Sequence, residues 1–147
     1  MRRRAVGASG LSVGRLGLGT MTWGGDVNPE TARLLLRDFV AAGGDLIDTA
    51  PAYGGGRAEE LIGRYMRSDL RREDLVLATK AGFGTHGGAQ TVDTSRRAML
   101  DDLADSLRRL RTDHVDLWQV HAWGDAPLEE TLAALDQAVN AGMARYA

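Results

Sequence analysis

Four side chains in this sequence have the types and the spacing needed to move a proton. Each follows, or lies just behind, a short apolar run, and the four are Asp48, Tyr53, Lys80 and His121. A tyrosine, with an ordinary pKa of about 10, donates its proton at neutral pH only where a nearby cation stabilises the phenolate. A lysine supplies that cation, an aspartate keeps the ammonium charged and aimed, and a histidine holds a carbonyl oxygen beside the phenol. The set suits protonation of a carbonyl as a hydride reaches its carbon, which requires a nicotinamide cofactor.

Each of these residues also has an ordinary structural role open to it. Asp48 can cap a strand end, Tyr53 can pack on a rim, and His121 can be a satisfied rim histidine. Lys80 is the single lysine among 18 basic residues, which indicates either a need for a compact charge at that point or chance survival in an arginine-rich chain. Their joint occurrence behind three successive strands favours the chemical interpretation.

The elements that must position these side chains alternate along the chain. A hairpin is predicted at 4–13, and a glycine-rich loop at 81–91. Strands are predicted at 16–20, 46–48, 75–80, 115–120 and 144–147. Helices are predicted at 28–43, 58–66, 95–110 and 127–142. Asn28 and Pro29 form a typical helix start, whereas Ala58 is a poor cap.

Apolar spacing also predicts which helix faces are buried. In the first helix the buried face is expected at Leu35, Phe39 and Val40. In the third helix and the fourth helix the expected buried sets are Met99, Leu103, Leu107 and Leu110, and Leu132, Leu135 and Val139.

Regular alternation of strand and helix predicts a parallel α/β sheet with right-handed crossovers. Two architectures fit: a doubly wound five-stranded sheet, or the first half of a (β/α)₈ barrel with an N-terminal hairpin. In both, the C-terminal ends of the strands share one face. Thr20, Asp48 with Tyr53, Lys80 and His121 are therefore expected to converge there.

Composition excludes several classes of protein. The chain has 147 residues, 44% hydrophobic and 26% charged, as expected for one globular unit. A net charge of -2 predicts no nucleic-acid or other polyanionic partner. No run is apolar enough for a membrane span or a signal peptide, so a cytoplasmic protein is expected. With no cysteine and no paired histidine spacing, no metal site is predicted.

The ordered motifs resemble those of the aldo-keto reductases. Gly17-Leu18-Gly19-Thr20 has no third glycine of a dinucleotide fingerprint, since Thr22 stands there. The full set of matching runs is Gly17 to Thr20, Asp48 to Gly54, Ala58 to Gly63, Ala78 to Lys80 and Asp113 to His121.

This resemblance implies a (β/α)₈ barrel closed at its base by a hairpin, a small carbonyl substrate, and NADP(H) bound without a Rossmann domain. It implies that Tyr53 is the general acid, that Lys80 and Asp48 tune it, and that His121 orients the carbonyl. It further places Gly19, Thr20 and Met21, together with Asp48, beside the nicotinamide.

The resemblance has departures. Family members are roughly twice as long, and residues 1–147 correspond to one unit, the N-terminal half, which stops at the start of a fifth strand. Ala58 stands where a serine is usual. An alternative therefore remains, a catalytically inactive half-barrel that acts as an oligomerising or nucleotide-sensing subunit, with a second copy or a C-terminal half as its partner.

Overall fold

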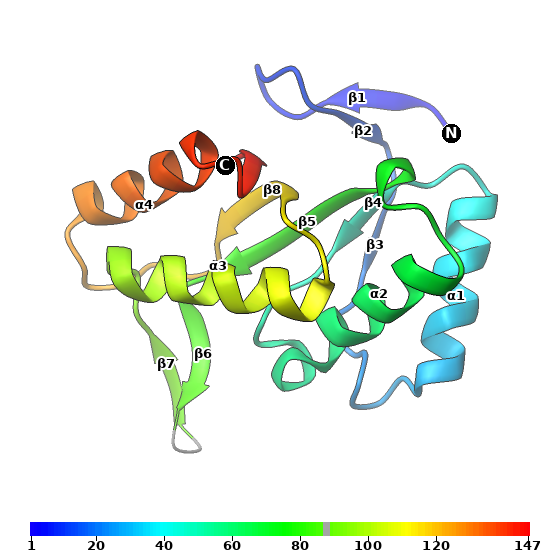
Figure 1. Ribbon diagram of the computed structural model, residues 1–147, viewed down its shortest axis with the longest axis horizontal. Coiled ribbons are helices and arrows are strands. Elements are labelled where there is room, and N and C mark those ends of the chain that lie inside the picture. Colours follow the sequence, from blue (N-terminus) through cyan, green and yellow to red (C-terminus); the bar gives the residue numbers. More distant parts are fainter. Residues whose placement is uncertain (87–88) are drawn as a thin grey trace.

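The computed structural model describes residues 1–86 and 89–147 (Figure 1). The α-helices are α1 (Pro29–Ala41), α2 (Arg57–Ser68), α3 (Arg96–Leu110) and α4 (Leu128–Asn140). Two 3-10 turns are η1 (Tyr53–Gly56) and η2 (Arg72–Asp74). The strands are β1 (Arg3–Ala5), β2 (Ser12–Gly14), β3 (Gly17–Gly19), β4 (Leu46–Asp48), β5 (Val76–Ala81), β6 (Phe83–His86), β7 (Ala89–Val92), β8 (Val115–Val120) and β9 (Ala144–Tyr146).

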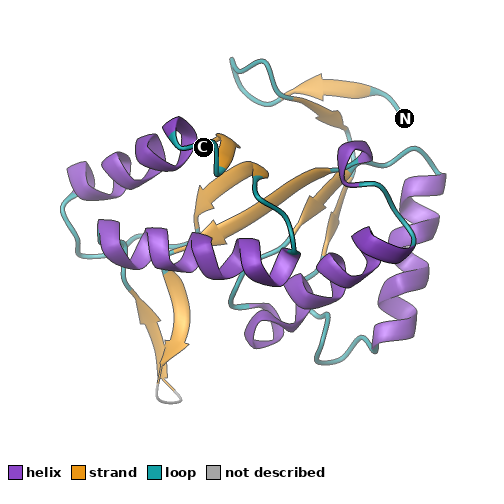
Figure 2. Cartoon of the chain, viewed as in Figure 1, coloured by secondary structure: helices purple, strands orange, loops and turns teal. Residues whose placement is uncertain are grey.

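The main sheet decides between the two predicted architectures. Its five strands are parallel and lie in chain order, β3-β4-β5-β8-β9. A doubly wound sheet reverses direction at a switch point, which this order lacks. Right-handed crossovers that all step the same way place their helices on the same face, and α2 and α3 cross in front of the strands in Figures 1 and 2. The sheet is therefore that of a partial (β/α)₈ barrel.

The predicted start of α1 is correct in detail, and that of α3 is correct to within a residue. Asn28 caps α1, because its side-chain oxygen accepts a hydrogen bond from the N–H of Thr31 at 2.9 Å. Ser95 caps α3 in the same way, through the N–H of Ala98. The cap of α2 is Gly56, with no side-chain hydrogen bond, so this helix starts without the usual polar cap.

The buried face of α1 differs from the prediction. Leu35 is 44% exposed, whereas Ala32 and Leu36 are fully buried. Phe39 and Val40 do pack against the core. Ala32, Leu36 and Phe39 share one stripe at helical spacing, and Leu35 lies about 100° away from Leu36 around the axis. Three consecutive leucines, at 34–36, made it hard to predict from the sequence which of them faces the core.

The buried face of α4 also differs. Thr131, Ala134 and Ala138 are buried, while Leu132 is 52% exposed and Val139 is 37% exposed. Leu135, as predicted, packs at the edge of the core. Small residues occupy the buried side because they let the helix approach its neighbours closely, and the larger side chains Leu132 and Val139 are left exposed.

The two hairpins lie at opposite ends of the sheet (Figure 1). Strands β1 and β2 pair antiparallel, as predicted, on the side where the parallel strands begin. Asp45 joins this hairpin to the sheet, since its carboxylate accepts hydrogen bonds from the Arg3 guanidinium at 2.5 Å and the Gly14 N–H at 2.8 Å.

The stretch predicted as a glycine-rich loop is largely a second hairpin, β6–β7, with Phe83 paired to Val92. Gly87 and Gly88 of the predicted loop lie outside the described residues. In the hairpin register Thr85 lies opposite Gln90, a pairing that the run of glycines obscured in the sequence.

Side chains buried between the sheet and the helices form the core. The largest of them, all with almost no exposed surface, are Trp23, Leu36, Ile47, Ile62, Leu77, Met99, Leu103, Leu110 and Trp118.

Candidate active site

The Lys80 ammonium joins two of the other predicted residues. Its Nζ atom lies 2.9 and 2.8 Å from the two carboxylate oxygens of Asp48, 2.9 Å from the carbonyl oxygen of Thr49, and 3.1 Å from the hydroxyl of Tyr53. Nζ is also 4.8 Å from the centre of the Tyr53 ring. The lysine side chain is only 13% exposed. A largely buried cation is thus shared between a carboxylate and a phenol.

Strand alternation explains why Lys80 reaches this site. Successive side chains of a strand point to opposite faces. Thr79 points toward α2, where its hydroxyl donates a hydrogen bond to Glu59. Lys80 therefore points to the face away from the helices, next to Asp48 at the end of β4.

Tyr53 is brought over Asp48 by a turn that depends on glycine. The 3-10 turn η1 begins at Tyr53 and continues through Gly54, Gly55 and Gly56, all of which have positive φ. At Gly54 a Cβ would lie only 2.6 Å from the carbonyl oxygen of Trp23. Glycine is thus needed there both for its backbone conformation and for close approach. The loop does fold the phenol back toward the strand end.

His121 lies beside Tyr53 and Phe83. Its ring is 5.8 Å from the Tyr53 ring, nearly perpendicular to it, and 5.1 Å from the ring of Phe83. Burial lowers the pKa of His121 below its usual 6.5, and the positive charge of Lys80 lowers it further, while Asp48 acts in the opposite direction. The imidazole is therefore neutral at pH 7.

Asp48 is held at both its main chain and its side chain. The N–H and the hydroxyl of Thr20 both donate to the Asp48 carbonyl oxygen, each at 3.0 Å. The Gln119 amide donates to the Asp48 carboxylate at 3.4 Å, because Gln119 pairs with Lys80 in the ladder between β5 and β8. Gln119 was not among the residues predicted for the site. Its position in β8, two residues before His121 in sequence, is the signal that identifies it.

The Gly19-Thr20-Met21 segment lies at the end of β3, beside Asp48 in the register. A Cβ at Gly19 would meet no atom within 4 Å, and Met21 is 68% exposed. Thr20 is fully buried, and its carbonyl oxygen accepts from the N–H of Trp23. All polar groups of Thr20 therefore bond within the chain. The residues on either side of it are accessible: Gly19 has open space beside it, and Met21 has an exposed side chain.

A buried network lies behind the site, between β5, α2 and α3. The Glu59 side chain has no exposed surface. One of its oxygens accepts a hydrogen bond from Thr79 at 2.6 Å, and the other pairs with the Arg109 guanidinium at 2.7 Å. Burial of a carboxylate is tolerated where both oxygens are satisfied in this way. In sequence Glu59 looks like an ordinary acid of a first helical turn, so this role was missed.

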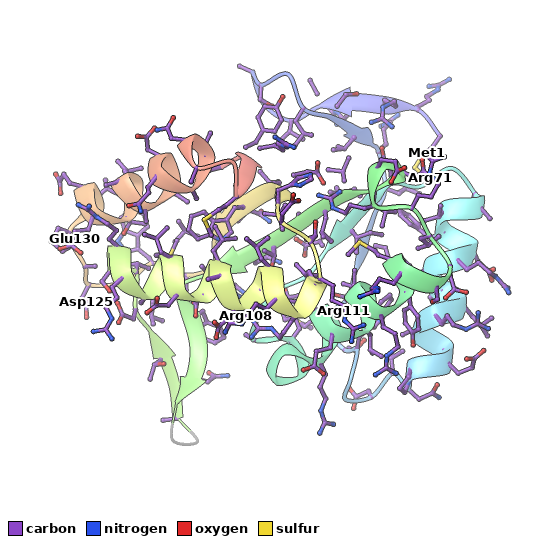
Figure 3. All side chains as sticks on the ribbon, in the orientation of Figure 1. Met1, Arg71, Arg108, Arg111, Asp125 and Glu130 are labelled. Atoms are coloured by element: carbon purple, nitrogen blue, oxygen red, sulfur yellow. The ribbon has the colours of Figure 1, made fainter. Side chains whose placement is uncertain are left out.

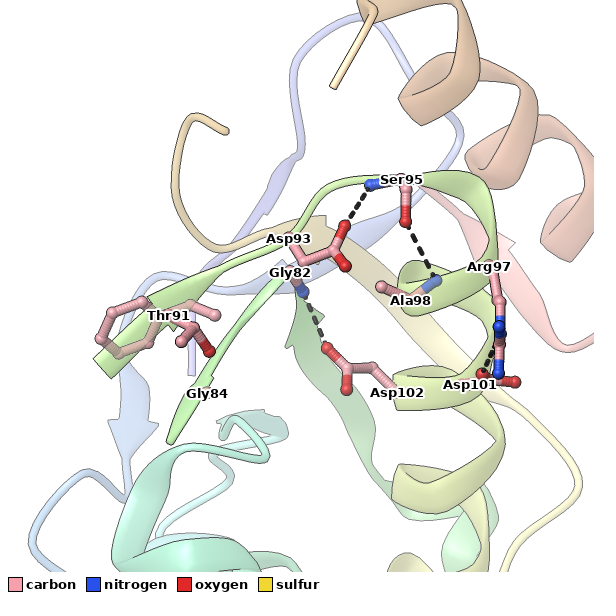
Figure 4. Close-up of a pocket in the computed structure, with 10 residues that line it drawn as sticks. Gly82, Gly84, Thr91, Asp93, Ser95, Arg97, Ala98, Asp101 and Asp102 are labelled. Atoms are coloured by element: carbon pink, nitrogen blue, oxygen red, sulfur yellow. Dashed lines mark hydrogen bonds and ion pairs between the residues drawn. The ribbon is translucent and has the colours of Figure 1, made fainter. Parts of the chain in front are cut away.

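An open cavity of about 460 Å³ lies between the β6–β7 hairpin and the start of α3 (Figure 4). Asp102 fixes one wall, since its carboxylate accepts a hydrogen bond from the N–H of Gly82 at 2.9 Å. Gly82 has a φ of +85° and turns the chain from β5 into the hairpin. Phe83, which lines the cavity, also contacts His121. The hairpin thereby forms a wall next to the candidate site.

The two tryptophans near the strand ends differ in environment. Trp23 is 2% exposed and belongs to the core, whereas Trp123 is 82% exposed. Trp123 lines a smaller apolar pocket of about 150 Å³, together with Val120 and Ala122, the neighbours of His121 in sequence. Trp123 is thus the one of the pair that faces solvent beside the site.

With this geometry established, comparison with known proteins gives the family. A model described as "Aldo/keto reductase family" matches residues 15–147. The chain belongs to the aldo/keto reductase family. The predicted family resemblance and barrel architecture are confirmed.

Relatives of two kinds support this assignment. Aldo-keto reductase YhdN of Bacillus subtilis is 34% identical over 99% of this chain and 45% of its own length. The uncharacterized oxidoreductase YqkF of the same organism is 35% identical, with 99% and 47% covered. The holo form of aldo-keto reductase AKR11C1 from Bacillus halodurans superposes with a TM-score of 0.90 at 35% identity, covering 99% of this chain and 49% of that one. The chain spans about half the length of the relatives it matches.

Family members of this kind are oxidoreductases, and the fold agrees with that class. Among the helices within residues 1–86 and 89–147, none combines the length and the apolar character that crossing a membrane requires.

Proposed function

We propose that this chain carries the proton-donating half of an NADP(H)-dependent aldo-keto reductase that reduces aldehydes or ketones to alcohols. The observation that carries the proposal is the position of the Lys80 ammonium, in contact with both the Tyr53 hydroxyl and the Asp48 carboxylate. In this proposal residues 1–147 act as one unit, the first half of the barrel.

Tyr53 is the general acid in this mechanism. As negative charge develops on the carbonyl oxygen of the substrate, the phenol gives up its proton to that oxygen. Lys80 stabilises the phenolate that remains, because its positive charge lies 3.1 Å from the phenol oxygen. Asp48 keeps the ammonium in place with two hydrogen bonds, so that the charge stays aimed at Tyr53.

His121 orients the carbonyl. A neutral imidazole offers one N–H to a carbonyl oxygen without competing with Tyr53 as an acid. The lowered pKa of His121 supports this state at pH 7. Phe83 and Tyr53 pack against the ring from two sides and limit its rotation.

The residues at the end of β3 fit a nicotinamide cofactor. Gly19 leaves open space at the strand end, and the exposed side chain of Met21 is free to cover an apolar ring. Thr20 acts indirectly, because its hydroxyl donates a hydrogen bond to the Asp48 carbonyl oxygen and so holds the end of β4 next to Gly19 and Met21. When bound, the cofactor supplies the hydride. The choice of NADP(H) rests on the family, whose members generally use it.

The experiment that tests the proposal follows the oxidation of NADPH in the presence of a reactive aromatic aldehyde. It uses two proteins, the 147-residue chain and a chimera in which the chain is joined after β9 to the C-terminal half of YhdN. Turnover by either protein that is lost in Tyr53→Phe supports the proposal. A folded chimera that binds NADPH but does not reduce the aldehyde would overturn it.

A further inference from the structure

The outer surface of the helix layer carries a second feature, whose residues are different from those of the candidate active site. An open groove of about 420 Å³ lies between α2 and α3. Four of its five lining side chains are arginines, and the set is Glu60, Arg64, Arg108, Arg109 and Arg111. The chain as a whole has a net charge of -2. The fold therefore concentrates positive charge that the overall composition does not reveal.

The floor of this arginine groove is rigid. Arg109 is 24% exposed and is fixed by its ion pair with the buried Glu59 and a hydrogen bond to Ser106 at 3.3 Å. It also packs on Gly56, where a Cβ would lie 2.8 Å from its side chain. A guanidinium held in one orientation binds an anion at a smaller entropic cost than a free side chain does.

Two of the four arginines have an explanation in helix stability alone. Arg108 and Arg109 lie in the last turn of α3, where positive charge interacts favourably with the helix dipole. Arg108 also pairs with Asp105. Arg64 and Arg111 are different, because within the described residues neither side chain has an ion-pair partner. Figure 3 shows Arg108 and Arg111 next to each other at the end of α3.

Arg111 is kept at a position that favours glycine. It follows α3 with a φ of 57° and a ψ of 41°, and it is the only non-glycine residue with positive φ in residues 1–86 and 89–147. Glycine is the usual residue at this point of a helix end because it has no Cβ. The guanidinium of Arg111 therefore stands in the groove despite a less favourable backbone.

We propose that the arginine groove binds a small, multiply charged phosphate compound. Guanidinium groups present paired N–H donors that match phosphate oxygens. Because Arg108 and Arg109 already have carboxylate partners, Arg64 and Arg111 are the two groups left to neutralise the charge of a bound anion. The lining has no apolar side chain, which favours a free diphosphate group over an acidic protein segment that would also bury apolar surface. This inference does not depend on carbonyl reduction.

The test is calorimetric titration of the 147-residue chain with inorganic pyrophosphate at low salt. The double variant Arg64→Gln/Arg111→Gly removes the two unpaired guanidiniums, and it gives position 111 its preferred residue, so the fold is retained. We expect saturable binding to the unmodified chain, weakened about tenfold or more in the double variant.

The control is Arg4→Gln/Arg15→Gln, which changes the net charge equally at two exposed arginines outside the groove. It is expected to bind as the unmodified chain does. Absence of saturable binding, or equal weakening in the control and the double variant, would overturn the proposal. Circular dichroism on each variant verifies that the helices are intact.

Discussion

The Nζ atom of Lys80 lies 3.1 Å from the hydroxyl of Tyr53 and 2.8 Å from the nearer carboxylate oxygen of Asp48. One cation therefore contacts both a carboxylate and a phenol; in the proposed mechanism it also stabilises the phenolate once the proton has left. β4 supplies the carboxylate, β5 the ammonium, and the turn after β4 the phenol. Most consequences of this arrangement can be tested by single substitutions.

Tyr53→Phe removes the proposed proton donor and leaves the ring. We expect turnover of an aldehyde to fall by about 10²-fold to 10⁴-fold, the usual contribution of a positioned general acid. Steady-state kinetics on the form that shows turnover measures this loss. Tyr146→Phe, on β9, is the matched control and should keep its rate. Equal rates for the Tyr53 variant and the control would contradict the assigned role.

Glu59→Ala breaks the buried network behind the site. The substitution leaves the Thr79 hydroxyl and the Arg109 guanidinium without their partner. We expect the free energy of unfolding to fall by about 3 kcal/mol, since Arg109 retains some contact with water. Urea denaturation measures this change. Glu60→Ala, its exposed neighbour in α2, should cost less than about 0.5 kcal/mol. Similar costs for the two would rule out a stabilising role for the network.

Gly63→Ala tests how closely α2 and α3 approach. A Cβ at this position would lie 2.3 Å from the carbonyl oxygen of Arg109 and 2.8 Å from that of Leu110. Both are main-chain atoms of α3, so relief requires a shift of the helix. We expect a loss of about 3 kcal/mol in the free energy of unfolding, although alanine is the better helix former.

The control for Gly63→Ala is Gly25→Ala. A Cβ there would have its nearest neighbour at 3.8 Å, and the φ of Gly25 is not positive. Its cost should stay below about 1 kcal/mol. If Gly63→Ala is as stable as this control, the helices are less tightly packed than the structure indicates.

His121 predicts a pH dependence of stability. Because the folded protein lowers the pKa of this imidazole below 6.5, protons bind the unfolded chain more tightly. The stabilising contribution of neutral His121 is thus complete above pH about 6.5 and is lost progressively as the pH falls from there toward the lowered pKa. The free energy of unfolding of the wild type, measured at several pH values and taken relative to that of His121→Gln, should be lower at about pH 5 than at about pH 7. A constant difference would contradict the lowered pKa.

Much of the fold was predictable because the signals were local. The Asn28 cap marked the start of α1, and apolar runs marked β4, β5 and β8 to within a residue or two. The buried faces of α1 and α4 were harder to predict. Leucines occur on more than one side of these helices, and the buried positions include alanines such as Ala134, which allow close packing. The side of a helix that is buried depends on its neighbours, which local spacing does not describe.

The candidate site was predictable in part for a related reason. Parallel strands bring their C-terminal ends together, so chemistry-bearing residues at those ends were expected to meet. Asp48, Tyr53 and Lys80 do so through hydrogen bonds, and His121 through ring contact with Tyr53. Glu59 could not be found this way, because its partners Thr79 and Arg109 come from other elements and appear only once α2, α3 and β5 are packed.

The strand order of the main sheet also bears on how the chain reaches its folded state. Each ladder joins strands that follow one another in the sheet and are separated in the chain by one crossover. Within the described main sheet each strand pairs with the strand that the preceding crossover brings to it, so each new unit can add to the one made before it while the chain is still being synthesised. A chain arranged in this way is suited to fold from its N-terminus onward, as the ribosome releases it.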